Sequence, residues 1–568
     1  MILLEKLPKS VGIFILFMSL ATLSFGTASV GTEVHYQEID SLVYRVDFVF
    51  YRTCQAVSVS DPRDAQVICA SSGQKQALSP MFRTGNFLKV FCDARGDQCG
   101  GKLNSSRSGD GVEKLIFSDT VDFKTSPFSS FITNGCTEIR FEFGGCCRPG
   151  NLNSGAGNTT YYNFATLNLG ARNSTPEFTI EPPTQLLLNQ PVNINLGAID
   201  PEGDSLSYSM GTVMTKFGTS ATYSGALTPQ VPLAVYYPGN LKYPYSNPAA
   251  NPPIGLHLDD AAGQLTFTPV GKDFYGIILI EVTEWRKDKS TGKHVAIAKT
   301  RREWNVNVLA YPNHSPALVG NFNNTFCEGD KVVFDLKTKD PSYVEPPPGP
   351  TYTDTTTINW YTSLSSPTIS KVDTSRELGL HMEWQTQSGD ASTRPYLLYV
   401  HATDNRCGYR SHVSNAIQFN VSETPDTFSL NVDSLGCGFY RVSSSYLQKD
   451  TSGVRCEVSV RSKKNLATIH VFGGGSKSNR WNGLIDVNSN DTYYIDYKVS
   501  VNSKCFKVRS DSFVVADMAE HKINSDTTIC YPVAGIDLRT WEASTSKGGA
   551  WKNLTASGTI DTMGLYQP

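Results

Sequence analysis

Three carboxylates stand on alternate positions of one turn, DPEGDS, in the second quarter of the chain. They are Asp200, Glu202 and Asp204, and Gly203 permits a tight bend between them. Calcium takes several oxygen ligands, and an extracellular loop with clustered carboxylates can supply them. The loop spacing and distal glutamate of an EF-hand are absent. Two interpretations stay open: a calcium site with these three residues as ligands, or an acidic, solvated turn.

Acidic residues later in the chain could complete such a calcium site. Glu281 and Glu284 would join it only if their predicted strand lies beside the turn. About one repeat further on, Asp340 matches Asp200, and Asp404 falls near the place of Glu284. The second set has fewer acidic neighbours, so calcium is less expected there.

The familiar catalytic patterns are missing from the sequence. It contains no Gly-x-Ser-x-Gly elbow, no His-Glu-x-x-His helix and no phosphate loop. His257 stands between two leucines and is expected to be an ordinary strand residue. The stretch FGGGSKSNRW (472–481) lacks the Gly-Lys-Ser/Thr ending of a phosphate loop, which favours a hairpin loop. We therefore predict that the chain is not an enzyme.

Thirteen cysteines indicate an oxidising compartment, where disulfide bonds persist. No two CxxC pairs occur, so a zinc site is not expected. Seven cysteines lie between Cys54 and Cys147, which leaves at least one without a partner there, and Cys69 is the residue we expect. Cys92 and Cys99 could close a small loop, and Cys327 could pair with Cys407. The disulfide candidates are Cys54, Cys92, Cys99, Cys136, Cys146, Cys147, Cys327, Cys407, Cys437 and Cys505.

The N-terminus predicts export. Lys6 and Lys9 precede an apolar run that passes into small residues, which is typical of a signal peptide (1–28) cleaved after Ala28. An uncleaved anchor is the alternative, although the run is short for a membrane span. No later stretch is long and apolar enough to cross a bilayer. A formal net charge of −3, without a dense basic stripe, gives no basis for nucleic-acid binding.

The remaining 540 residues or so predict a series of β modules. Alternating apolar residues between turn signals favour an all-β protein of tandem β-sandwiches, of the immunoglobulin, cadherin or PKD type, behind a disulfide-bonded N-terminal β module. We expect the Pro- and Tyr-rich stretch 228–254 to be a long packed loop rather than disordered. The predicted boundaries are 31–175 for the cysteine-rich module, 176–311 and 312–422 for two cadherin-like sandwiches, 423–518 for an Ig-like module and 519–568 for a partial PKD-like module. Because the last piece is short, we expect the native chain to continue past Pro568.

Several segments, in this order, resemble large secreted surface proteins of Bacteroidetes. They include VDFVFYRTC, GCCRPGNLNS, NSTPEF, DPEGDSLSYSM and GIILIEVTEWR. Such proteins carry a cysteine-containing N-terminal module and cadherin-, PKD- or Ig-like modules. Many end in a gliding-motility-associated C-terminal domain, which this sequence lacks. The resemblance is good over 33–311, fair over 312–422 and weak beyond.

These observations predict a non-catalytic, structural or adhesive protein, secreted to a bacterial cell surface. Its partner would be a cell-surface or extracellular protein or glycan. One alternative is a glycan-binding accessory region of a larger secreted enzyme, with the tyrosines of VYYPGNLKYPYS (235–246) as candidate contacts. Another is a component of an envelope secretion or motility machine. The ligand and the oligomeric state do not follow from the sequence.

Overall fold

The computed structural model describes most of residues 29–515 and three short pieces after them. The gaps are 55, 57, 60–63, 89–110, 321–322, 341–342, 345–350, 353, 375–376, 393, 407–408, 426–427, 437–438, 447–454, 465–467, 475–479 and 487–490, and the later pieces are 536–537, 559–560 and 565–567. The predicted signal peptide and Cys92, Cys99, Cys407 and Cys437 lie outside the described residues.

The chain divides into two compact units. The first unit comprises Met1–Asn324, Lys331–Gln385 and Arg394–Asn420, and the second comprises Thr325–Asp330, Thr386–Thr393 and Val421–Pro568. Both units are built from strands, which confirms the predicted all-β class. The helical elements among the described residues are α2 (Ser129–Thr133) and a short 3-10 turn at Leu169–Ala171.

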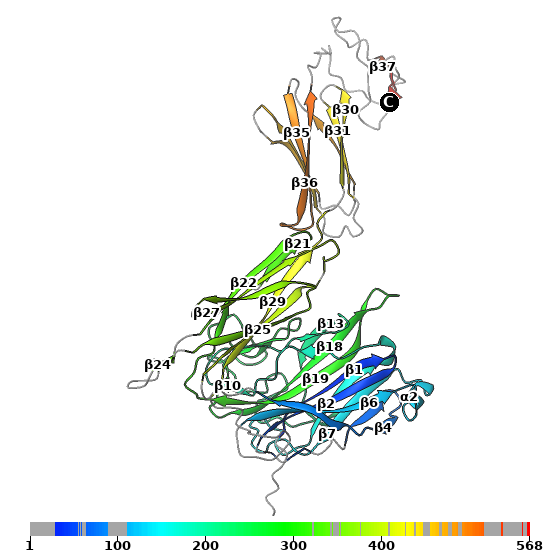
Figure 1. Cartoon of the computed structure of the whole chain (residues 1–568). Coiled ribbons are helices and arrows are strands. Elements are labelled where there is room, and N and C mark those ends of the chain that lie inside the picture. Colours follow the sequence, from blue (N-terminus) through cyan, green and yellow to red (C-terminus); the bar gives the residue numbers. More distant parts are fainter. Residues whose placement is uncertain are drawn as a thin grey trace, which may run out of the picture. The chain divides into compact units, whose positions relative to one another are not determined.

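The first unit is organised around a fourteen-stranded sheet (Figure 1). Its central order is β4-β3-β7-β8-β19-β1-β2-β6-β5. These strands are β1 (Ser29–Asp40), β2 (Val43–Thr53), β3 (Gln66–Cys69), β4 (Lys75–Ala77), β5 (Met81–Phe87), β6 (Val112–Asp122), β7 (Glu138–Gly145), β8 (Tyr161–Asn168) and β19 (His294–Leu309). The alternation VYRVDF at the start of β2 matches its alternating buried pattern, so one face of the strand enters the core.

Strand β19 joins the two N-terminal modules that the sequence predicted as separate. It pairs with β1 on one side and, along its length, with β18 (Tyr275–Lys287), β8 and β10 (Gln185–Leu187). β18 in turn pairs with β13 (Ser205–Met210). Strands from both sides of the predicted boundary between residues 175 and 176 therefore share one sheet.

Smaller sheets and a long loop complete the part of the first unit around 176–311. The short strands are β9 (Glu177–Phe178), β11 (Val192–Asn195), β12 (Ala198–Ile199), β14 (Met214–Lys216), β15 (Thr219–Ser220), β16 (His257–Leu258) and β17 (Gln264–Phe267). The loop 228–254 packs Val231, Leu233 and Val235 into the same core as β17 and β18, which confirms the predicted packed loop. His257 is a strand residue, as predicted.

The predicted sandwich over 312–422 also forms two sets of antiparallel strands. One sheet has the order β20-β22-β27-β26, and β28 pairs with β25 and β29 in the other. The strands are β20 (Ala317–Val319), β22 (Lys331–Lys339), β25 (Thr356–Thr362), β26 (Thr368–Thr374), β27 (Glu377–Gln385), β28 (Tyr396–Asp404) and β29 (His412–Ser422). A two-stranded piece is formed by β23 (Tyr343–Val344) and β24 (Thr351–Tyr352). In β22 the strict alternation of KVVFDLKTK places Val332, Phe334 and Leu336 in the core.

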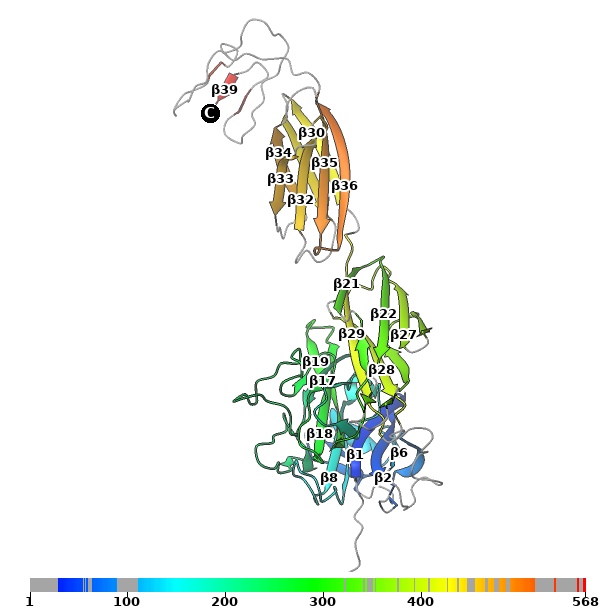
Figure 2. The same cartoon turned by 90° about the vertical axis from the view of Figure 1, so that its left-hand side faces the viewer.

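The second unit contains its own two-sheet module. Figure 2 shows β33, β32, β35 and β36 side by side, in the order of the four-stranded sheet. The strands are β30 (Phe428–Gly436), β31 (Phe439–Tyr446), β32 (Arg455–Ser462), β33 (Thr468–Gly474), β34 (Arg480–Asp486), β35 (Asp491–Ser500) and β36 (Phe506–Val515). Strand β21 (Asn323–Cys327) is not part of these two sheets and belongs to the sheet of order β21-β29-β28-β25. Beyond them lie β37 (Ile536–Asp537), β38 (Thr559–Ile560) and β39 (Leu565–Gln567). Tyr493, Ile495 and Tyr497 on alternate positions of β35 are fully buried in its core.

The structure shows how several N-terminal cysteines are bonded. Cys69 is bonded to Cys136, so the prediction that Cys69 is the unpaired thiol is wrong. This bond ties the end of β3 to the residues before β7, which are neighbouring strands. Cys146 and Cys147, two of the disulfide candidates, are bonded to each other. Cys54 is also disulfide-bonded.

The expected bond between Cys327 and Cys407 is wrong as well. Cys327 is bonded to Cys505, within the second unit. The two cysteines are 178 residues apart in the sequence, and spacing alone could not favour this partner over a nearer one.

Candidate functional site

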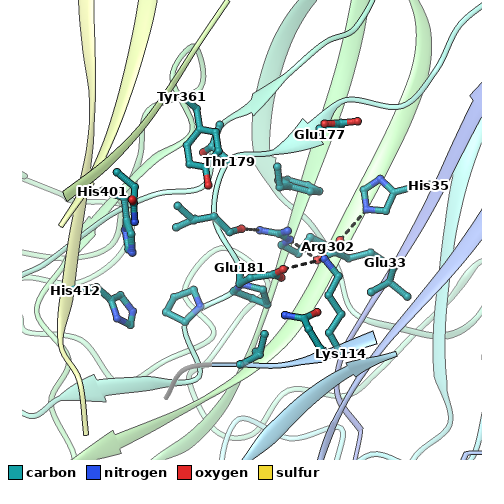
Figure 3. A pocket seen from close by; sticks show the side chains of 18 of the residues that line it. Glu33, His35, Lys114, Glu177, Thr179, Glu181, Arg302, Tyr361, His401 and His412 are labelled. Carbon is teal, nitrogen blue, oxygen red and sulfur yellow. Dashed lines mark hydrogen bonds and ion pairs between the residues drawn. The ribbon is translucent and has the colours of Figure 1, made fainter. Parts of the chain in front are cut away.

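The first unit contains a cavity of about 950 Å³ (Figure 3). Its walls come from β1, β2, the extended segment Glu177–Gln185, and strands β25, β28 and β29. Most of the residues that line it are of polar or charged type. This cavity is the candidate functional site, because ligand sites are concave and carry a few fixed polar groups.

A buried ion pair forms the floor of the cavity. Glu33 on β1 and Arg302 on β19 lie opposite each other in the sheet register, and Arg302 Nε donates to Glu33 Oε1 at 2.6 Å. Both side chains are 2% exposed. Arg302 also donates to the Ile180 carbonyl at 2.7 Å and lies 3.7 Å above the Phe178 ring. Burial by itself raises the pKa of Glu33, but the charge of Arg302 and the hydrogen bond from His35 hold that pKa well below its usual range.

Tyr51 and Lys114 extend this pair into a network. The Tyr51 hydroxyl lies 3.0 Å from Glu33 Oε1 and 2.8 Å from Glu181 Oε2, and can donate to either. Lys114 Nζ lies 3.0 Å from Glu181 Oε1. Burial, together with the charges of Glu33 and Glu181, raises the pKa of Tyr51 well above its ordinary value. The phenol therefore stays protonated, and the acids at the floor are neutralised by Arg302 and Lys114.

A threonine, a histidine and a glutamate follow one another along the wall. His35 Nδ1 is 3.2 Å from Thr175 Oγ1, and His35 Nε2 is 2.7 Å from Glu33 Oε2. The order resembles a nucleophile, base and acid. However, Thr175 is buried, and its hydroxyl already lies between the backbone NH and carbonyl of Tyr36, at 3.2 Å from each. This geometry fixes the segment before β9 against β1.

Two histidines stand together on the opposite wall. His401 on β28 and His412 on β29 have ring centroids 5.8 Å apart. His401 Nε2 is 2.9 Å from Thr403 Oγ1, while Nδ1 is buried without a hydrogen-bond partner. Burial lowers the pKa of His401 to about 3, with a further contribution from His412, and burial lowers the pKa of His412 to about 4. Both rings are neutral at physiological pH.

The acidic turn DPEGDS, considered above as a calcium site, is held together by hydrogen bonds and an ion pair. Asp200 Oδ1 accepts hydrogen bonds from the backbone NH of Glu202 at 3.0 Å and of Asp204 at 2.8 Å. The Asp204 carboxylate is held by Arg286, whose Nε donates to both of its oxygens at 2.8 and 2.9 Å. Glu202 is exposed. Among the described residues, no group of three or more His, Cys, Asp or Glu side chains is arranged to hold a metal ion.

Strand β18, which carries Glu284, lies beside this turn, as would be required for Glu284 to join a calcium site there. Glu284 is opposite Leu206 in the pairing of β13 with β18. Its Oε2 accepts from Asn173 Nδ2, whereas Glu284 Oε1 and Asp200 Oδ2 are buried without a partner. Burial raises the pKa of Glu284 to about 9, and the charges of Asp200 and its neighbours add to this. Burial is also the main cause that raises the pKa of Asp200 to about 6.

Glu281, the other acid considered for the calcium shell, is occupied elsewhere. Its carboxylate pairs with Arg301 at 3.1 Å and Lys299 at 3.2 Å, both on β19. The loop 472–481 lies partly outside the described residues, between β33 and β34.

The next sandwich has a similar pair of acids, Asp340 and Asp404, of which Asp404 is buried. Asp404 Oδ2 accepts from Asn313 Nδ2 at 2.6 Å, as Glu284 does from Asn173. Both oxygens of Asp340 are buried without a hydrogen-bond partner. Burial, then the charge of Asp404, raises the pKa of Asp340 to about 7, and burial raises that of Asp404 to about 6. The sequence match of Asp340 and Asp404 to the earlier pair thus corresponds to a shared local structure.

The Glu33–Arg302 network was not predicted from the sequence. One signal was available: strand β19 carries Arg301, Arg302 and Glu303 in succession, and all three are buried. Buried charges in a strand require partners. The partners themselves come from distant segments, Glu33 for Arg302 and Arg148 for Glu303, at 2.8 Å in the latter case.

Comparisons with known proteins add little to this picture. No protein-family model and no curated protein matches the chain. Among solved structures, the FN1–FN3 domains of chicken CNTN1 are 9% identical, with coverage of 60% of this chain and 99% of theirs, at a TM-score of 0.20. The D1–D4 ectodomain fragment of ICAM-5 is also 9% identical, with coverage of 84% and 96%, at a TM-score of 0.20. Scores this low carry no argument. No helix among the described residues is long and apolar enough to span a membrane.

Proposed function

We propose that this chain is a non-catalytic, exported structural or adhesive protein of a bacterial cell surface, related to the multidomain surface proteins of Bacteroidetes. Its cavity-bearing first unit is the binding region, and the β modules that follow connect it to the envelope. The partner is an extracellular or cell-surface protein or glycan. Disulfide bonds in both units support an oxidising location.

The observation that carries this proposal is the continuous sheet of the first unit. Strand β19 hydrogen-bonds to both N-terminal modules, and three ion pairs with nearly buried arginines lie along it: Arg302–Glu33, Arg301–Glu281 and Arg148–Glu303. Removing one member of such a buried pair is strongly destabilising, so the strands are held in one arrangement. A rigid unit of this kind suits a scaffold that presents a preformed cavity.

The acid–base groups of the cavity support binding rather than catalysis. Thr175 has its hydroxyl between backbone groups, and the carboxylate of Glu33 is shared with Arg302. A nucleophile needs a free path to its substrate and a base that can accept its proton. His35→Ala is the direct test. If the parent protein hydrolysed activated esters or peptides and this variant did not, the non-catalytic assignment would be wrong.

Location is tested by protease shaving of intact native cells, followed by mass spectrometry of the released peptides. Surface peptides from the first unit are expected, together with peptides past Pro568 if the native chain continues. Peptides released only after lysis would contradict a surface location and favour a structural part inside the envelope. A cytoplasmic marker protein serves as the control for cell integrity.

Glycan binding is the second candidate, favoured by one specific observation. Tyr243 and Tyr245 in the predicted stretch are 48% and 44% exposed, and aromatic faces stack on sugar rings. Tyr237 in the same loop is half-buried and packs against the core. If glycans bind here, Tyr243→Ala with Tyr245→Ala abolishes glycan-array signals of the parent without lowering its melting temperature. A blank array for the parent protein would count against this candidate.

A further inference from the structure

Strand β36 forms one edge of the four-stranded sheet in the second unit (Figure 2). It pairs antiparallel with β35 over all of its 10 residues, Phe506–Val515, and no described strand pairs with its other side. It is the longest strand at a sheet edge in the described parts of the chain. An edge of this length presents backbone NH and carbonyl groups that a further strand can bind.

One face of β36 carries two opposite charges on this open edge. Arg509 lies opposite Tyr497, and Asp511 lies opposite Ile495. Both partners on β35 are buried in the core of the module. Residues that stand opposite each other in an antiparallel pair share a face of the sheet, so Arg509 and Asp511 lie on the core side. Both are nevertheless exposed, which shows that the other sheet of the module does not cover them.

The opposite face of β36 carries exposed apolar side chains. Phe506, Val508 and Val514 are 45%, 46% and 70% exposed. Phe506 and Val508 stand near the beginning of the strand and Val514 near its end, with Ser510 and Ser512 between them. Within one copy of the chain, the apolar residues of this face are therefore separated along the strand.

We propose that the β36 edges of two copies of this chain pair antiparallel, with Ser510 on the two-fold axis. In that register, Arg509 of each copy lies opposite Asp511 of the other, which gives two ion pairs related by symmetry. Opposite charges at directly opposed positions stabilise an antiparallel pair, because their Cβ atoms are only about 5 Å apart. The strand is thus complementary in charge to a second copy of itself.

The same register brings the separated apolar side chains together. Phe506 of one copy lies opposite Val514 of the other, with Val508 as a diagonal neighbour. Moving the axis by one residue along the strand would place Arg509 opposite Arg509 of the second copy, or Asp511 opposite Asp511. Like charges at directly opposed positions are destabilising, so the charges select the register centred on Ser510.

The charges also favour a second copy over an unrelated strand. Charged side chains on an edge strand usually oppose pairing with other chains. Here only a strand with an acid and a base at matching positions gains from lying beside Arg509 and Asp511. An interface made by one strand edge stays below about 1,200 Å², which is typical of weak and transient contacts. Such a dimer carries two copies of the first unit, so it binds a surface bivalently whatever ligand the cavity takes.

Sedimentation velocity of the full chain tests the proposal at concentrations up to about 0.3 mM, because a weak dimer is populated only at high concentration. The parent should dimerise increasingly as its concentration rises. Arg509→Asp and Asp511→Arg should each weaken this association about tenfold or more, since each variant places like charges opposite each other twice per dimer. Both side chains are exposed, so the melting temperatures should stay close to that of the parent. An equimolar mixture of the two variants should associate again, because every opposed pair in the mixed dimer has opposite charges.

A disulfide cross-link tests the register. Ser510→Cys places a thiol opposite its own copy on the two-fold axis. Ser512→Cys is the matched control, because its two thiols would stand four residues apart along the strand, about 14 Å. A disulfide needs Cα atoms within about 7 Å, so mild oxidation should give a covalent dimer of Ser510→Cys and none of Ser512→Cys.

Four results would overturn the proposal. A parent that stays monomeric at about 0.3 mM would show that the edges do not pair. If both charge variants associate as the parent does, the copies meet at another surface. A mixture that associates as weakly as the single variants would exclude the opposition of Arg509 and Asp511. Equal cross-linking of the two cysteine variants, or none from Ser510→Cys, would exclude an axis at Ser510.

Discussion

Removing Arg302 should loosen the contact between β1 and β19 and leave distant strands unchanged. In Arg302→Met, Glu33 stays 1% exposed but loses its partner at 2.6 Å. Breaking a buried pair by removing one partner costs about 3–5 kcal/mol. Since about 1.4 kcal/mol corresponds to a factor of ten, amide exchange in β1 and β19 should become about 10²- to 10⁴-fold faster. Hydrogen exchange followed by mass spectrometry measures this strand by strand, so the second unit does not obscure it.

The double variant Glu33→Gln with Arg302→Met separates charge from packing. With both charges gone, no ion is left buried without a partner, and most of the lost protection should return. Lys124→Met is the control, because its pair with Asp40 at 2.8 Å is on the surface and should not affect exchange in β1. If the double variant exchanges as fast as Arg302→Met, the loss comes from packing and the charge argument is refuted. An Arg302→Met variant with unchanged exchange would refute it as well.

Two further predictions concern the two histidines of the cavity wall and the disulfide bond of the second unit. Because His401 and His412 have pKa values of about 3 and 4 against 6.5 in the unfolded chain, the unfolded state binds more protons below pH 6.5, and stability falls as pH drops from 6.5 towards 4. At pH 5 the loss in free energy of unfolding is at most about 2 kcal/mol per ring. Urea unfolding at pH 8 and pH 5 measures this loss, which should be present in the parent and absent from the double variant His401→Gln with His412→Gln. Equal losses in the two proteins would contradict the assignment. Replacing Cys327 and Cys505 by alanine should destabilise the second unit by about 2–4 kcal/mol and lower the melting temperature of that unit relative to the parent. A variant that melts like the parent would show that the bond contributes no stability.

Strand identity and module type could be predicted because they depend on local alternation. In β22, KVVFDLKTK places every second residue in the core, and β2 begins in the same way. A period of two in side-chain burial is a property of the strand itself, so no distant contact is needed to see it. The matching of Asp340 to Asp200 was available for the same reason, as both follow a strand in similar sequence contexts.

Partners distant in sequence could not be predicted. Cys327 bonds to Cys505 rather than Cys407, and Arg302 pairs with Glu33, because three-dimensional proximity selects the partner and spacing does not. Asp204 shows the limit most clearly. Its place in an acidic turn suggested a metal ligand, but Arg286 reaches it from a strand that the turn sequence does not reveal.

The sequence by itself determined an all-β chain of sandwich modules with a cysteine-rich start, since alternation, turn residues and cysteine content are local properties. Only the tertiary structure decided that β19 merges the two N-terminal modules into one sheet, that a cavity lies above the Glu33–Arg302 pair, and that single carboxylate oxygens of Asp200 and Glu284 are left without a hydrogen-bond partner. These features depend on which strands meet and on what burial does to charges. Both are consequences of packing between segments far apart in the chain.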